Sequence, residues 1–207
     1  AEQASQVADL LNDMEPDDRT AFLEQLPGEV AQRLMQLLTP DNRAVATTLL
    51  GYPEDSIGRL MTPEYVAVRP HFTVEETLAH IRQYGHDSET LNVIYVVDDK
   101  WQLLDGLRIR EAILASPEQR ISDLMDYKYD SLNAFDDQEA AVTAFKKYDR
   151  VVLPVVDTKG ILLGIVTVDD ILDIAEEEGT EDFQRFGAVK DAIISPLQAT
   201  VSFLYRK

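Results

Sequence analysis

A run of acidic side chains near the C-terminal end is the strongest chemical signal in the sequence. The stretch TVDDILDIAEEEGTED, residues 167–182, contains eight carboxylates and neither lysine nor arginine. Like charges four residues apart on a helix cost a few tenths of a kcal/mol per pair. Carboxylate arrays suit hard divalent cations, which prefer oxygen ligands. The run has no histidine or cysteine, so it does not suit zinc.

Helical spacing predicts how this run is arranged. Asp170, Asp173 and Glu177 would share one face of a helix, while Val168 and Ile171 would share an apolar face. Magnesium keeps several of its waters and takes one or two carboxylates directly, which fits sites shared between facing surfaces. Spacing alone does not separate magnesium from calcium. A solvated acidic face that binds no ion is the alternative interpretation.

The composition limits the classes of partner. The chain has 207 residues, enough for one large domain or a few small ones, and a formal net charge of −19. This charge disfavours nucleic acid and favours cations or a basic protein surface. The sequence contains no cysteine and no run of eighteen apolar residues. It lacks an initiator methionine and stops abruptly, so we expect a piece of a longer protein.

Two regions with different sequence patterns, one helical and one with alternating strands and helices, predict an α+β fold. Residues 1–52 read as short helices, with Pro16 and Pro40 at helix starts and a weak repeat at a shift of 24. From residue 57 onward, strand-like runs at 65–68, 93–97, 151–156 and 161–167 alternate with helical runs. Thr73 and Glu76 match a capping box at the start of one of these helices.

The second region repeats itself. Leu60-Met61 recurs as Leu124-Met125 at a shift of 64, and Val96-Val97-Asp98 recurs as Val155-Val156-Asp157 at a shift of 59. The first copy therefore carries about five extra residues, which we place in the stretch GHDSETLN. A period near sixty residues indicates a duplicated domain rather than a solenoid.

These residues resemble a known family. LMTP at 60–63 and GIVTVDD at 164–170 resemble the opening and closing motifs of a tandem of CBS domains. LMTPEYVAV, the stretch from VLPVVDTKG through the acidic run to FGAV, and the preceding helices together are similar to the cytosolic part of MgtE-type magnesium transporters.

The resemblance implies a domain plan and a location. Residues 1–54 would be the C-terminal part of the helical MgtE N-domain, followed by CBS domain 1 at 57–119 and CBS domain 2 at 120–178. Residues 179–207 would form a connecting helix that leads to a transmembrane pore domain of the same polypeptide, which this sequence lacks. The implied assembly is a homodimer on the cytoplasmic side of the cell membrane.

The resemblance also implies a set of Mg²⁺-binding acids. For Glu139 the alternative is a first-turn helix charge, and Asp17 and Asp18 could equally be first-turn acids after Pro16. The implied ligands are Asp170, Asp173, Glu178, Glu181 and Asp182 in the acidic run, Glu139 and Asp149 in the second repeat, and Asp17 and Asp18 in the helical domain.

The function implied is magnesium sensing, in which Mg²⁺ at acidic domain interfaces favours a compact closed state that gates the pore. The alternative is a regulatory module that senses an adenine nucleotide such as ATP, with Thr167 and Asp170 holding ribose and phosphates as in many CBS tandems. Repeat one departs from that pattern with Arg108 and Glu111. A structural dimerisation module is a third reading. An enzyme is not expected, because no G-x-S-x-G, P-loop or G-x-G-x-x-G motif is present.

Overall fold

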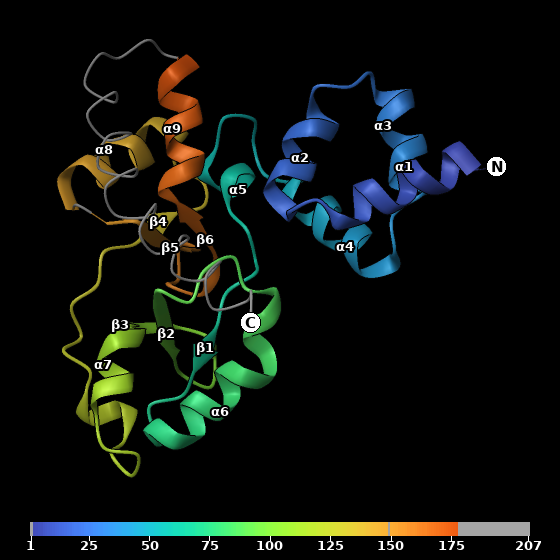
Figure 1. Cartoon of the computed structure of the whole chain (residues 1–207). Helices are drawn as coiled ribbons and strands as arrows, with labels where there is room; N and C mark the ends of the chain where they lie inside the picture. The colour runs from blue at the N-terminus through green and yellow to red at the C-terminus, as the bar shows by residue number, and fades with distance from the viewer. Residues whose placement is uncertain (1, 149, 178–207) are drawn as a thin grey trace. The chain divides into compact units, whose positions relative to one another are not determined.

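The computed structural model describes residues 2–148 and 150–177 (Figure 1). The chain divides into two compact units, residues 1–166 and residues 167–207, which are described separately. Within the described residues, no helix is both long enough and apolar enough to cross a bilayer.

Four short helices form the N-terminal region: α1 (Glu2–Asp13), α2 (Pro16–Glu24), α3 (Gly28–Met35) and α4 (Pro40–Leu49). Proline stands in the first turn of α2 and of α4, as predicted, where its missing N–H and fixed φ fit a helix start. Thr39 caps α4 by accepting a hydrogen bond from the Asn42 amide at 3.3 Å. Leu11, Leu23, Leu38 and Ala46 form the buried apolar cluster of this region.

The duplicated region begins with α5 (Ile57–Leu60). Its first copy continues with β1 (Ala67–Val68), α6 (Val74–Tyr84), the 3-10 helix η1 (Gly85–Asp87), β2 (Val93–Val97), β3 (Leu103–Arg108) and α7 (Ile109–Leu114). The second copy consists of the 3-10 helix η2 (Ile121–Asp123), β4 (Leu132–Asn133), α8 (Gln138–Tyr148), β5 (Val152–Val156), β6 (Leu162–Thr167) and α9 (Val168–Glu177). Each copy forms a three-stranded sheet, in the orders β1-β2-β3 and β4-β5-β6. The α+β class is therefore confirmed.

The strand predictions were right in position and incomplete in number. The run at 93–97 is strand β2, whereas the run at 65–68 shrinks to the two residues of β1, which pair in parallel with β2. Strands β3 and β4 were not predicted. Asp105 and Gly106 interrupt the apolar pattern of β3, and β4 is too short for a periodic signal.

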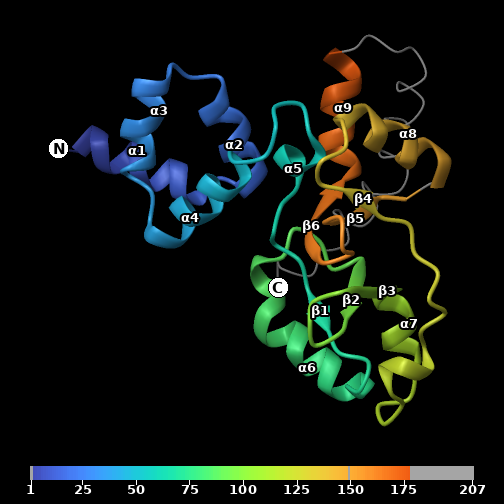
Figure 2. The ribbon, with the colours of Figure 1, turned by 180° about the vertical axis from the view of Figure 1, so that it is seen from behind.

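Alternation along β2 explains how the first sheet is covered on both faces. Ile94 and Val96 pack in a core with Val74 and Ile81 of α6 and Ala112 of α7. Both helices lie on the same side of the sheet (Figures 1 and 2). The intervening residues of β2, Tyr95 and Val97, pack instead with Val152, Leu162 and Ile165 of the second sheet. The two sheets therefore face each other, with helices α6 and α7 outside the first.

The internal repeat extends to details of the backbone. Helices α6 and α8 keep the shift of 64, and eight residues separate α6 from β2 where three separate α8 from β5. This difference confirms the predicted five-residue insertion. In the β2–β3 turn, Asp98 Oδ1 accepts from the amides of Lys100 and Gln102, each at 2.8 Å. In the β5–β6 turn, Asp157 does the same for Lys159 and Ile161, 59 residues later.

The predicted capping box is also present. Thr73 Oγ1 accepts from the Glu76 amide at 3.1 Å, and Glu76 Oε2 accepts from the Thr73 amide at 2.7 Å. The box satisfies two of the amides that a helix start leaves without partners, and it fixes where α6 begins.

Candidate functional site

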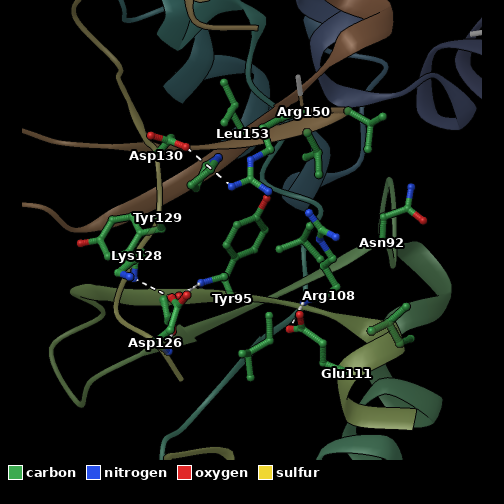
Figure 3. Close-up of a pocket in the computed structure, with 18 of the residues that line it drawn as sticks. Asn92, Tyr95, Arg108, Glu111, Asp126, Lys128, Tyr129, Asp130, Arg150 and Leu153 are labelled. Atoms are coloured by element: carbon green, nitrogen blue, oxygen red, sulfur yellow. Dashed lines mark hydrogen bonds and ion pairs between the residues drawn. The ribbon is translucent and has the colours of Figure 1, made fainter. Parts of the chain in front are cut away.

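A cavity of about 640 Å³ lies beside β3 (Figure 3). It is bordered by strands of both sheets and by residues 124–130 between η2 and β4 (the linker). Its walls come from four segments: residues 92, 93 and 95 at the start of β2, residues 105–111 of β3 and α7, residues 124, 126 and 128–130 of the linker, and residues 150–154 at the start of β5. All four segments belong to the unit of residues 1–166. The volume falls within the range of pockets that hold small molecules and cofactors.

The cavity lining carries charges of both signs. Four cationic side chains line it: Arg108, Arg110, Lys128 and Arg150. Four acids accompany them: Asp105, Glu111, Asp126 and Asp130. The Arg150 guanidinium lies 3.8 Å from a carboxylate oxygen of Asp130, which is a loose ion pair that leaves donors of Arg150 for a ligand. Such a lining suits a ligand that combines anionic groups with hydrogen-bond donors.

Tyr95 adds a buried hydroxyl to this cavity. Its ring belongs to the core between the sheets, and its side chain is directed toward Arg150 (Figure 3). The hydroxyl is buried and has no hydrogen-bond partner among the described residues, and burial raises the pKa of this phenol. A buried polar atom without a partner costs free energy, so the Tyr95 hydroxyl is well placed to bond a ligand or water.

Hydrogen bonds to β3 fix the linker wall of the cavity. Asp105, a buried residue, accepts backbone hydrogen bonds from Asp126 at 2.9 Å and from Tyr127 at 3.0 Å. The Tyr129 hydroxyl donates to the Leu103 carbonyl at 2.9 Å. Side chains of residues 126–130 are thereby held at the edge of the cavity.

The two residues predicted for a nucleotide serve as a helix cap in repeat two. The Thr167 amide and hydroxyl both donate to Asp170 Oδ2, each at 2.8 Å, at the first turn of α9. Neither residue is among those that line the cavity. Their counterparts in repeat one, Arg108 and Glu111, do line it. Sequence reasoning treated that pair as a departure and so missed the cavity, although the density of charge at 108–111 and 126–130 was a usable signal.

Only some of the predicted metal ligands lie among the described residues. Asp17 and Asp18 lie in the first turn of α2, where Asp17 is buried and Asp18 is exposed. Glu139 is exposed in the first turn of α8. Asp149, the side chain of Asp173, and all of Glu178, Glu181 and Asp182 lie outside the described residues. Among the side chains that are described, no group of three or more potential ligands is placed to hold a metal ion, so the metal site stays a prediction.

Asp17 has an electrostatic neighbour in its own helix. Arg19 is buried, and this burial lowers the pKa of its guanidinium, while the charges of Glu64 and Asp17 oppose the effect. Asp17 therefore helps to offset a buried cation.

Comparison with known proteins identifies the parts of the chain. The model for the MgtE intracellular N domain matches residues 1–55, and the model for the CBS domain matches residues 57–107 and 121–177. The chain is therefore a tandem CBS module that follows an MgtE-type helical domain. The first model is named for MgtE, and the curated MgtE relatives are magnesium transporters and not enzymes, in agreement with the prediction.

Two curated proteins are similar to this chain in sequence. The magnesium transporter MgtE of Thermus thermophilus is 49% identical over 158 residues, which are 76% of this chain and 35% of that protein. The magnesium transporter MgtE of Bacillus subtilis is 34% identical over 197 residues, which are 95% of this chain and 44% of that protein. The chain thus spans less than half the length of these curated relatives.

Two solved structures match this chain over a larger share of their own length. The crystal structure of the cytosolic domain of the Mg²⁺ channel MgtE in complex with ATP has a TM-score of 0.78 and 41% identity, and it covers 84% of this chain and 74% of that one. The soluble part of a magnesium transporter has a TM-score of 0.81 and 30% identity, with 86% and 69% covered. This chain belongs to the MgtE family.

Proposed function

We propose that the chain is the magnesium-sensing regulatory region of a magnesium channel or transporter, on the cytoplasmic side of the membrane. The observation that carries this proposal is the match over 84% of the chain to the cytosolic domain of a Mg²⁺ channel. The net charge of −19 and the acidic run at 167–182 supply the chemistry. The predicted ligands are the nine acids that the family resemblance implies.

Electrostatic repulsion supplies the mechanism. Two unit charges about 6 Å apart repel by roughly 3 kcal/mol at an effective dielectric constant near 20. Several facing carboxylates can therefore hold two surfaces apart, and a divalent ion between them reverses the sign of the interaction. An ion that binds the closed form alone shifts the population toward it. In the full-length protein, closure would pass through residues 179–207 to a pore of the same polypeptide.

Thermal melting tests this proposal. Magnesium should raise the melting temperature of the wild-type chain, by an amount equivalent to about 2.7 kcal/mol at one hundred times the dissociation constant. The double variant Asp173→Asn/Glu178→Gln should lose most of this response. The matched control Asp99→Asn/Glu118→Gln removes the same charge at exposed sites outside the predicted set and should keep it. An equal response in all three proteins would contradict these ligands.

Homodimerisation is part of the same proposal. Ile113 and Leu114 on α7 are large apolar side chains that are 60% and 74% exposed. Ile113 lines a groove between α6 and α7 that also carries Glu75 and Arg82, and Leu114 is its neighbour in the sequence. Opposite charges beside an apolar strip suit a two-fold contact, in which each acid meets the partner's base. Sedimentation equilibrium of wild type and Ile113→Glu tests this, since the variant should be monomeric at concentrations where wild type is dimeric.

Adenine-nucleotide binding is a second candidate, favoured by the charged cavity. Arg108, Lys128 and Arg150 offer cationic donors that suit phosphates, and the related cytosolic domain was solved in complex with ATP. The nucleotide is assigned here to the repeat-one cavity instead of to Thr167 and Asp170. ATP titration by calorimetry, in EDTA, should show binding that Arg150→Gln weakens about tenfold. Arg120→Gln, outside the lining, should leave the affinity unchanged.

A further inference from the structure

The last strand of each repeat contacts a segment of the other repeat, and the two equivalent contacts use different hydrogen bonds. In one, Thr62 and Ile165 exchange two backbone hydrogen bonds, each 2.9 Å long. The repeat shifts of 64 and 59 place Asp126 at the position of Thr62 and Gly106 at the position of Ile165. No such backbone bridge joins Asp126 to Gly106 among the bridges of the described residues.

A carboxylate takes the place of the missing bridge. Asp105 is 1% exposed, and its Oδ2 accepts from the amides of Asp126 and Tyr127 at 2.9 and 3.0 Å. Its Oδ1 accepts from the Gly106 amide at 2.8 Å. One side chain therefore stands between strand β3 and the linker and satisfies donors of both.

The counterpart of Asp105 in repeat two has no room for a side chain. That residue is Gly164, and a Cβ built there would lie 2.7 Å from the Thr62 carbonyl oxygen. Direct backbone pairing thus excludes a side chain in repeat two, whereas the Asp105 carboxylate spaces the linker from β3 in repeat one. The linker accommodates this with Tyr127 at φ 59°, a conformation that residues other than glycine seldom adopt.

We propose that Asp105 is a positioning residue that holds linker residues 124–130 away from β3 as a wall of the 640 Å³ cavity. Asp126, Lys128, Tyr129 and Asp130 line the cavity from this segment. Release of Asp105 frees the linker and removes Lys128 from its place, so affinity for an anionic ligand falls although Asp105 itself binds no phosphate. The effect on affinity rests on nucleotide binding as proposed above, whereas the tether does not.

An amide cannot replace the carboxylate at this site. Both carboxylate oxygens accept hydrogen bonds, so either orientation of an asparagine places its NH₂ group against a backbone N–H. At Asp98 both backbone amides donate to Oδ1, and the oxygen of an asparagine can accept both. Asp98→Asn is therefore a matched control: the same atoms change in the turn between β2 and β3, and every donor keeps its acceptor.

The test compares wild type, Asp105→Asn and Asp98→Asn by hydrogen exchange and by ATP titration. In Asp105→Asn, exchange in peptides covering 124–130 should rise about tenfold, with β5 at 152–156 unchanged, and ATP affinity should fall about tenfold. Asp98→Asn should match wild type in both measurements. Asp105→Gly, which removes both the spacer and the misplaced NH₂, should likewise show faster exchange in 124–130 and weaker ATP binding.

Different results would overturn the two parts of the proposal, which are the tether of the linker by Asp105 and its effect on ATP affinity. Exchange in 124–130 that stays at the wild-type level in both Asp105 variants would overturn the tether. Faster exchange with unchanged ATP affinity would overturn the positioning role. If the wild-type chain does not bind ATP, the nucleotide candidate fails together with the affinity effect, while the exchange result still decides the tether. Exchange that rises equally at 124–130 and 152–156 would indicate general destabilisation and would also count against it.

Discussion

The two CBS repeats share a backbone fold and differ in the side chains at equivalent positions. Repeat one has Arg108 and Glu111 where repeat two has Thr167 and Asp170, and Asp105 where repeat two has Gly164. The first set borders a charged cavity, whereas Thr167 and Asp170 close a helix cap at the start of the acidic run. Duplication thus supplied two equivalent frameworks, and substitutions at a few positions gave repeat one a charged cavity and repeat two a helix cap.

The same divergence appears at the hairpin turns. Trp101 has φ 64°, and its counterpart Gly160 has φ 82°. Glycine adopts this left-handed conformation without strain, whereas a tryptophan is strained there. The Arg69 guanidinium lies 4.8 Å from the centre of the Trp101 ring, a cation–π contact that offsets part of this strain. The fold tolerates a costly residue where a contact within the same repeat compensates.

Gly164→Ala should show the largest difference between the repeats. A Cβ at Gly164 would lie 2.7 Å from the Thr62 carbonyl oxygen and would disrupt the backbone bridge to Ile165. We expect a loss of about 3 kcal/mol in the free energy of unfolding by urea. Gly106→Ala is the control, because its Cβ would approach side chains and not backbone: Val93 at 3.3 Å and the Tyr95 ring at 3.8 Å. Equal losses in both variants would show that the bridge imposes no special constraint.

An alkaline titration should give an intermediate effect. Tyr65 donates to the Leu162 carbonyl at 3.3 Å, and burial raises its pKa from 10.0 to about 12. The folded state therefore keeps this proton at pH values where the unfolded state has lost it. The free energy of unfolding should be unaffected below pH 10 and should fall by about 2 kcal/mol as the pH rises toward 12.

Variants of two equivalent tyrosines test whether Tyr65 causes the loss of stability at alkaline pH. Tyr65→Phe should be less sensitive to alkaline pH than wild type, although buried Tyr95 contributes in the same direction. Tyr129 is the counterpart of Tyr65, at a shift of 64, and donates to Leu103. Tyr129→Phe should retain the alkaline loss, because Tyr65 remains. A Tyr65→Phe variant with the wild-type pH profile would contradict this explanation.

Removing the helix caps should give the smallest difference. Asp170→Ala deletes an acceptor of two hydrogen bonds at 2.8 Å, and we expect a cost of about 1 kcal/mol. Glu111→Ala deletes one hydrogen bond of 3.3 Å and should cost a few tenths of a kcal/mol. Urea unfolding in EDTA measures both, because bound magnesium would add its own contribution at Asp170. A larger loss for Glu111→Ala would reverse the roles assigned to the two caps.

The sequence predicted the framework better than the cavity. Helix starts at Pro16 and Pro40, the Thr73–Glu76 capping box, the insertion at 85–92 and the α+β class all depend on local patterns, and all are confirmed. The shift of 59 could also have located β3 from the strand predicted at 161–167.

Long-range geometry accounts for what the sequence did not predict. The cavity joins four separate segments of the chain, and the charge density at 108–111 and 126–130 does not by itself show that these segments meet. Asp105 bonds to amides 21 and 22 residues away, and a carboxylate that accepts from backbone N–H groups has no sequence signature. Repulsion within the acidic run, by contrast, is visible in the sequence because its charges are neighbours.

Small-angle scattering in EDTA and in saturating magnesium tests the central claim most directly. If Mg²⁺ joins acidic surfaces that otherwise repel, the radius of gyration should fall on addition of magnesium and recover when the ion is chelated. Asp173→Asn/Glu178→Gln should compact less than wild type. Superimposable profiles of the wild-type chain in the two conditions would contradict the claim.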